Sequence, residues 1–421
     1  MKLINQNSEI HAFLDTDKPT QIGVLRNRGS RVRDVFSFEF AKDFLAQEPE
    51  RAVVLDPHLK PLEGEQYCID SLPIFGLFQD ASPDRWGRLL MERRLNQQKR
   101  AGTVDETARL NTSDFLLGVH DLFRVGALRL RLNNGVHYEA HDSIKAAPPF
   151  VHLRDLEEAC HQVETGNDDE VDAWLRMLIA PGGSLGGARP KASVQHPDGR
   201  LWIAKFPSTR DKGNVGAWEA VAMTLADACD LNVPDFEVET FASDNHTFLI
   251  ERFDRNPDGG RIHFASAMTL TGRSDGQDHS DGASYLELAQ ILIQHGTKTE
   301  VDLHELWSRM VFNMLVSNTD DHLRNHGFLL DANGWRLAPL YDVNPTPHGA
   351  QGLKLNVNEV DNSLDLHLAL SVAGYFRLKP AQAQKRLSDM QAIVKQWETL
   401  ATKLGVTRNE QAQMARAFAL A

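Results

Sequence analysis

Short stretches in which apolar and polar residues alternate mark the first part of the chain. Residues 36–40 show this alternation, the segment 22–26 precedes them, and the turn-forming residues 27–30 lie between the two. Because a period of two buries one face of a strand, we predict a hairpin here. The segment from Phe75 to Arg94 predicts a loop that runs into a helix, with Pro83 near the helix start, where a missing N–H costs nothing.

Helical spacing replaces alternation over most of the second half of the chain. Apolar residues recur at helical positions over 218–229 and again over 303–314, and a helix is also expected over 171–179. The four residues from Thr299 to Asp302 predict a capping box at the start of one helix. Residues 380–421 predict further helices. Together the patterns predict an α+β protein whose C-terminal part is mostly helical.

Composition narrows the class of protein. A chain of 421 residues is too long for one small core, so two or three domains are expected. The net charge of −13 argues against a surface built for nucleic acid or anionic membrane. Cys68, Cys160 and Cys229 are scattered and indicate neither a disulfide framework nor a zinc site. No leader peptide or 18-residue apolar run is visible, so a reducing cytoplasm is expected.

The stretch Asn318-Thr319-Asp320-Asp321-His322-Leu323-Arg324-Asn325, followed by Leu340-Tyr341-Asp342-Val343, carries the clearest candidate chemistry. Asp320 and Asn325 have the Asp-x-x-x-x-Asn spacing of a kinase catalytic loop. Phosphoryl transfer from ATP needs oxygen ligands for Mg²⁺ and one further carboxylate to accept the proton of the attacking hydroxyl. Asp342 would be the second, metal-holding acid.

A predicted hairpin brings these groups together. Apolar-rich residues 326–331 and 335–340 flank Ala332-Asn333-Gly334, and Asn-Gly between such runs is a strong hairpin signal. A hairpin centred near Asn333 places position 325 across from position 341, so that Asn325 and Asp342 would arrive side by side. The alternative is that the polar residues of the loop only cap a turn.

Three features upstream occur in the order found in a kinase N-lobe. A glycine-rich loop over 181–194 can curl its N–H groups around phosphate. Lys205 lies within the apolar strand 201–206, and Glu219 follows fourteen residues later on a helix, where it could position the lysine. The apolar strand 248–255 lies where a hinge would offer backbone groups to adenine. The alternative is a snorkelling lysine and an exposed glutamate.

Taken together, these residues resemble the HipA family of bacterial serine/threonine kinases, the toxin half of a type II toxin–antitoxin pair. The resemblance runs over most of the chain, including the Pro-Asp-x-Trp-Gly motif at residues 83–87. It implies a two-lobed protein-kinase-like fold, with an N-terminal subdomain over 1–110, an N-lobe over 111–255 and a helical C-lobe over 256–421. It also implies ATP and Mg²⁺ as cofactors.

By motif position, the resemblance assigns a role to each candidate residue. Asp320 matches the catalytic base, with the loop histidine His322 beside it, and Asn325 and Asp342 match the metal ligands. Ser184 matches the serine that the family autophosphorylates, and Glu219 would pair with the ATP-phosphate lysine. The remaining positions expected to bind ATP are Gly186, Gly187, Ala188, Arg189, Lys191, Lys205, Glu251, Arg252, Phe253, His322, Tyr341 and Asp342.

The resemblance also implies partners. A small DNA-binding antitoxin of HipB type is expected, with DNA reached only through it, and the protein substrate could be an aminoacyl-tRNA synthetase. The loop departs from better-known members at Arg189-Pro190, which bears on its regulation. Two alternatives stay open: a small-molecule phosphotransferase of the same fold, and a catalytically quiet corepressor that binds an antitoxin on DNA.

Overall fold

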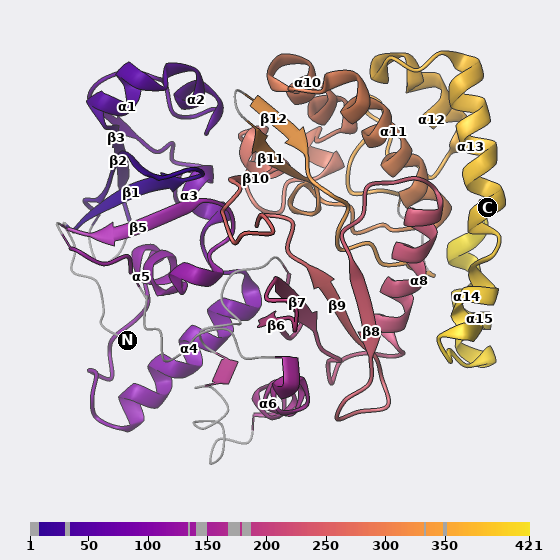
Figure 1. Ribbon diagram of the computed structural model, residues 1–421, viewed down its shortest axis with the longest axis horizontal. Coiled ribbons are helices and arrows are strands. Elements are labelled where there is room, and N and C mark those ends of the chain that lie inside the picture. The colour runs from indigo at the N-terminus through magenta and orange to yellow at the C-terminus, as the bar shows by residue number, and fades with distance from the viewer. Residues whose placement is uncertain are drawn as a thin grey trace. The chain divides into compact units, whose positions relative to one another are not determined.

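The computed structural model describes residues 8–29, 34–133, 135–139, 150–166, 177–178, 187–331, 334–347 and 352–421. The chain forms two compact units that are interleaved in sequence (Figure 1). The first unit contains residues 1–210 and 251–265, and the second contains residues 211–250 and 266–421. The three-part division expected from the sequence stays a prediction.

An antiparallel five-stranded sheet forms the N-terminal part of the first unit. Its order is β4-β3-β2-β1-β5, and the strands are β1 (Glu9–Asp15), β2 (Pro19–Asn27), β3 (Phe36–Phe40), β4 (Glu65–Tyr67) and β5 (Leu128–Leu132). Figure 1 labels β1, β2, β3 and β5. Phe38 is fully buried and meets Phe40 and Phe75 edge-on, with ring centroids 5.0 and 6.5 Å apart. The predicted hairpin over 22–26 and 36–40 is confirmed, since β2 pairs with β3.

Helices and one hairpin complete the first unit. The helices are α1 (Lys42–Gln47), α2 (Pro49–Val54), α3 (Gly76–Asp80), α4 (Arg85–Arg100), α5 (Thr112–Gly118) and α6 (Leu153–Thr165). Helix α4 begins after Pro83 as predicted, and the Asp84 carboxylate caps it by accepting the Gly87 N–H at 2.7 Å. The short α3 within the predicted loop was not expected. Strands β6 (Lys191–Gln195) and β7 (Leu201–Lys205) pair antiparallel.

The second unit is mostly helical. Its helices are α8 (Val215–Ala228), α9 (Ala267–Leu270), α10 (Tyr285–His295), α11 (Thr299–Leu315), α12 (Leu366–Val372), α13 (Pro380–Val394), α14 (Trp397–Lys403) and α15 (Arg408–Met414). Strands β8 (Phe236–Glu239) and β9 (Thr247–Glu251) pair antiparallel, and β10 (Phe264–Ser266) falls where the chain enters this unit. The helices predicted over 218–229, 303–314 and 380–421 are confirmed. The helix expected over 171–179 lies largely outside the described residues.

Two local predictions in the second unit were wrong in detail. Helix α11 has no capping box at Thr299, because the Thr299 hydroxyl donates instead to the carbonyls of Leu292 and Gly296. The hairpin of β11 (Gly327–Asp331) and β12 (Gly334–Leu337) forms as expected, but Gly334 already pairs with Asp331. The pairing is therefore shifted by one residue from the predicted pairing, and the paired strands do not reach positions 325 and 341.

Close packing explains why Gly334 begins β12. A Cβ at this position would lie 2.3 Å from the His295 carbonyl oxygen at the end of α10. The hairpin can thus lie directly against α10 and α11 in the second unit, where Trp335 is fully buried. In the part of the chain that the structure describes, no helix combines the length and apolar character needed to cross a bilayer.

Candidate active site

The loop after α11 presents one acid of a tandem pair to solvent. Asp320 is exposed, whereas Asp321 is only 1% exposed. The Asn325 side chain folds back and donates from Nδ2 to the Asp320 carbonyl at 2.9 Å, and the Asn325 N–H donates to the His322 carbonyl at 2.8 Å. These bonds close the loop into a fixed turn. They hold Asp320 and Asn325, the predicted base and metal ligand, on one short segment.

A second set of contacts ties this loop to the segment that carries Asp342. The Tyr341 hydroxyl donates to the Arg324 carbonyl at 2.8 Å. Asp342 itself has a left-handed backbone, with φ of 57°, which is strained for a non-glycine residue. Asn344 Nδ2 approaches one Asp342 oxygen at 3.4 Å. The structure therefore brings the loop and the Asp342 segment together by direct hydrogen bonds, although the strand register differs from the predicted one.

The donor atoms on these segments suit a magnesium ion. The Asn325 bond uses the amide nitrogen, so the amide oxygen stays available among the described residues. Mg²⁺ accepts only oxygen ligands and commonly takes one or two carboxylates plus substrate phosphates. Within the described ranges, no group of three or more His, Cys, Asp or Glu could hold a metal. A site of one acid and one amide is compatible with that finding, because phosphate oxygens and water would complete it.

Beneath the loop lies a buried polar layer that sequence reasoning did not assign. Asp321 accepts from the Tyr285 hydroxyl and from the Lys354 N–H, both at 2.6 Å. Burial raises the pKa of Asp321 to about 7, against the lowering effect of these two hydrogen bonds. Burial also lowers the pKa of His326 to about 3. The sequence showed the doubled Asp, but no role was predicted for Asp321 beyond the alternative that it caps a turn.

In the first unit, the segment before β6 is held by the start of α4. Gly187 and Ala188 are exposed and Arg189 is half-buried. The Lys191 ammonium, predicted to bind ATP phosphate, lies buried 3.0 Å from the Asp84 carboxylate. The Trp86 indole donates to the Lys191 carbonyl at 3.0 Å. The Pro-Asp-x-Trp-Gly motif thus anchors the end of the glycine-rich segment. Ser184 and Gly186 lie outside the described residues.

Lys205 and Glu219 lie on the expected elements. Lys205 is the last residue of β7 and is directly opposite Lys191 in the β6–β7 pairing, so the two side chains share one face. Glu219 is buried within α8 of the second unit. The ion pair between Lys205 and Glu219 stays a prediction.

Two side chains of the predicted hinge bind other residues of the protein. Arg252 is buried, and its guanidinium donates to both Asp254 oxygens at 2.9 and 2.7 Å and to the Phe123 carbonyl at 2.9 Å. Its N–H donates to the Leu201 carbonyl at 3.0 Å. The Glu251 carboxylate contacts the Arg200 guanidinium. The Arg252 side chain therefore braces the first unit, and Phe253, half-buried, packs against Phe264.

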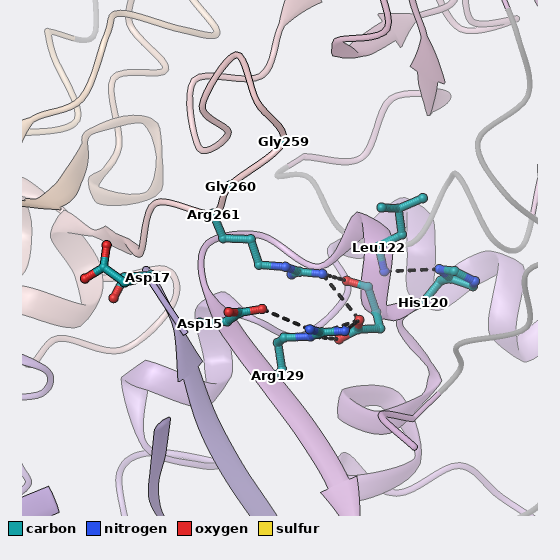
Figure 2. A pocket seen from close by; sticks show the side chains of 10 residues that line it. Asp15, Asp17, His120, Leu122, Arg129, Gly259, Gly260 and Arg261 are labelled. Atoms are coloured by element: carbon teal, nitrogen blue, oxygen red, sulfur yellow. Dashed lines mark hydrogen bonds and ion pairs between the residues drawn. The ribbon is translucent and has the colours of Figure 1, made fainter. Parts of the chain in front are cut away.

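Two cavities open in the first unit. The smaller, of about 190 Å³, is lined in part by Arg200, Glu251 and Arg252 and so adjoins the predicted hinge. The larger, of about 490 Å³, contains no predicted site residue. Figure 2 shows Asp15, Arg129 and Arg261 turned toward one another, with Arg129 bonded to Asp15 at 2.9 Å and to Asp121. Because these charges compensate one another, we assign the larger cavity no role.

Comparison with known proteins identifies the class. The HipA-like C-terminal domain profile matches residues 183–397, just over half of the chain. HipA of Shewanella oneidensis MR-1, solved as a toxin–antitoxin complex with HipB and operator DNA, has the same fold. It superposes with a TM-score of 0.64 over 98% of this chain and 96% of that chain, at 17% identity. The chain is a mixed α/β protein with the HipA fold, and it belongs to the HipA-like family.

The curated relatives match this chain over part of their length. “Putative kinase” of Haemophilus influenzae is 28% identical over 187 residues, 39% of this chain and 54% of that protein. “Putative kinase Y4mE” of Sinorhizobium fredii is 27% identical over 249 residues, 53% of this chain and 51% of that protein. The chain thus spans about half the length of the curated relatives it matches.

Proposed function

We propose that the chain is an ATP- and Mg²⁺-dependent serine/threonine protein kinase that acts as the toxin of a toxin–antitoxin pair. The observation that carries this proposal is the joined pair of segments in the second unit. Asp320 is exposed on a turn closed by Asn325, and Tyr341 bonds this turn to the segment of Asp342. Membership of the HipA-like family supports the same function.

Each residue has a task in this function. Asp320 accepts the proton from the attacking hydroxyl, because it is exposed and has no place in the metal-binding pair. Asn325 and Asp342 hold Mg²⁺, which neutralises the charge on the transferring phosphate. Lys205, paired with Glu219, contacts the ATP phosphates, and the segment over 186–191 covers them. Glu251, Arg252 and Phe253 supply the adenine side.

The test uses the whole chain with γ-labelled ATP, Mg²⁺ and a bacterial lysate. Wild type should label protein serine or threonine. Asp320→Asn should label nothing, because an amide cannot accept the proton. The exposed Asp389→Asn in α13 is the matched control and should label as wild type does. Label in small molecules alone would instead indicate a small-molecule phosphotransferase, and no label with wild type would remove the kinase proposal.

Two finer proposals concern regulation and partners. We propose that the kinase phosphorylates its own Ser184, which would add nearly two negative charges beside the ATP phosphates and switch the enzyme off. Intact mass after incubation with ATP should rise by one phosphate in wild type, and it should stay constant in Ser184→Ala and Asp320→Asn. An unmodified Ser184 in active enzyme would contradict this.

A HipB-type antitoxin is the proposed partner, and DNA would be bound only through it. The assembly of the Shewanella protein with HipB and operator DNA supports this. Operator DNA should be retarded by the chain together with its antitoxin and not by the chain alone. The protein substrate, proposed to be an aminoacyl-tRNA synthetase, would be identified by the labelling experiment above.

A further inference from the structure

Asp321 is a buried acid. None of the residues that the structure describes forms an ion pair with it, and the Lys354 ammonium lies 3.6 Å from Asp278 instead. Burying a carboxylate with no opposite charge is costly unless hydrogen bonds compensate it. Two strong donors do so here, the Tyr285 hydroxyl and the Lys354 N–H.

The hydrogen bonds around Asp321 run in one direction. Asn318 Nδ2 donates to Asn313 Oδ1 at 3.0 Å, and Asn313 Nδ2 donates to the Tyr285 hydroxyl at 3.0 Å. Because an amide nitrogen can only donate, the single Tyr285 hydrogen is left for Asp321. All of these side chains are buried. Asp321 is therefore the final acceptor of a chain of bonds that begins two residues before Asp320.

This chain of bonds extends to the segment of the proposed metal ligand. Asn318 Oδ1 accepts from the Asn344 N–H at 3.4 Å, and Asn344 Nδ2 approaches Asp342. Ser317 and Asp342 both have left-handed backbones, with φ of 49° and 57°. Such conformations persist only where the surroundings hold them. The network joins α10, α11 and both site segments at the point where that strain occurs.

Resting on the kinase function proposed above, we propose that Asp321 is a positioning residue, which fixes the backbone beneath Asp320 through Tyr285 and Asn313. It does not touch substrate. His326 takes part through the backbone, because its Nε2 lies 3.2 Å from the Asp321 carbonyl and a neutral ring can donate there. The raised pKa of Asp321, about 7, agrees with a carboxyl deprived of water.

The mildest test is Tyr285→Phe, which removes one hydroxyl and keeps the ring. Asp321→Asn is harsher, since an amide can accept from only one of its two donors. Both variants should lower kcat, by roughly ten-fold for Tyr285→Phe, because small misplacements of a base are costly. The KM for ATP should change by less than about two-fold, because the nucleotide contacts are intact. Hydrogen exchange over residues 318–326 should become faster in both.

Ser308→Ala is the matched control. It removes a buried hydroxyl from α11, the helix that carries Asn313, but among the described residues that hydroxyl bonds only within the helix, to the His304 carbonyl. Its kcat and loop exchange should match wild type. Wild-type kcat in Tyr285→Phe, or an equal fall in Ser308→Ala, would overturn the proposal.

Failure of the kinase function is distinguishable from failure of this inference. If wild type transfers no phosphate, the proposed function is wrong, and hydrogen exchange alone decides the positioning role. Faster hydrogen exchange confined to residues 318–326 would still support the inference that Asp321 fixes the loop. Unchanged exchange in Tyr285→Phe would remove it.

Discussion

The Lys191 ammonium lies 3.0 Å from the Asp84 carboxylate, although 107 positions separate the two residues. The two side chains are only 4% and 1% exposed. Lys191 also lies opposite Lys205 in the β6–β7 pairing, where two like charges would repel. Asp84 neutralises one of these lysines. The contact therefore joins the cap of α4 to the strand that follows the glycine-rich segment.

Breaking this buried pair should destabilise the first unit strongly. In Asp84→Asn the amide oxygen can still cap α4, but the buried Lys191 loses its counter-charge. We expect the free energy of unfolding to fall by about 3–5 kcal/mol. Adding Lys191→Met should restore much of it, because the uncompensated charge is removed. Urea unfolding measures the free energy of unfolding of both variants. The control is Asp389→Asn, which removes an exposed ion pair with Lys385 and should change that free energy by less than about 0.5 kcal/mol. Equal losses in Asp84→Asn and in the double variant would contradict this account.

Loss of either oxygen ligand should weaken magnesium-dependent nucleotide binding. Asp342→Asn and Asn325→Ala each remove a ligand atom from a cation with strict geometry. Calorimetry with ATP should show weaker binding than wild type when Mg²⁺ is present, and a much smaller difference when it is absent. Asp320→Asn, which leaves both ligands in place, should bind Mg·ATP as wild type does. Parental affinity in both ligand variants would remove these residues from the metal site.

The N-terminal turn of α8, which carries Glu219, depends on a glycine. A Cβ on Gly216 would lie 2.1 Å from the His246 carbonyl oxygen. Gly216→Ala should therefore lower the free energy of unfolding of the second unit by about 1–3 kcal/mol, despite the better helix propensity of alanine. Gly374→Ala is the control, because no atom of the described residues outside its own turn and chain neighbours lies within 4 Å of its Cβ position. Thermal melting of the two variants should differ in this direction.

One buried histidine should make the first unit sensitive to mild acid. His263 is 2% exposed, and burial lowers its pKa from 6.5 to about 4. Its contribution to stability is complete above pH 6.5 and is lost as pH falls toward 4, because the unfolded chain binds the proton more tightly. The loss amounts to about 3 kcal/mol. His263→Gln should flatten the dependence of unfolding free energy on pH in this window, whereas the exposed His367→Gln serves as the control for losing a histidine.

Local sequence patterns predicted the helices and strands of this fold better than they predicted its long-range contacts. The β2–β3 hairpin, α8, α11 and the β11–β12 hairpin follow from spacing that any short window of sequence contains. The partner of Lys191 could not be found that way, because the contact joins residues 107 positions apart. Arg252 likewise resembles a hinge residue in sequence, but its guanidinium is bound to Asp254 and to the carbonyl of Phe123.

In the site loop, too, local features were visible in the sequence and long-range contacts were not. The spacing of Asp320 and Asn325 was visible in the sequence, and the bond between them is local. The opposite environments of Asp320 and Asp321 were not visible, since adjacent acids differ only through what the loop packs against. Tyr285 and Lys354, the donors to Asp321, lie 36 positions before it and 33 after it.

The interleaving of the two units has a consequence for how the chain is made. A ribosome that has released residues 1–210 has not yet supplied Asp254, whose carboxylate accepts the Gly126 N–H at 2.7 Å. The first unit must therefore wait, partly formed, until the forty residues 211–250 of the second unit have also emerged. Neither unit can be excised as one continuous fragment. Splitting the chain between residues 210 and 251 would place Arg252 and Asp254 on a different fragment from the Phe123 carbonyl and the Gly126 N–H that they bind.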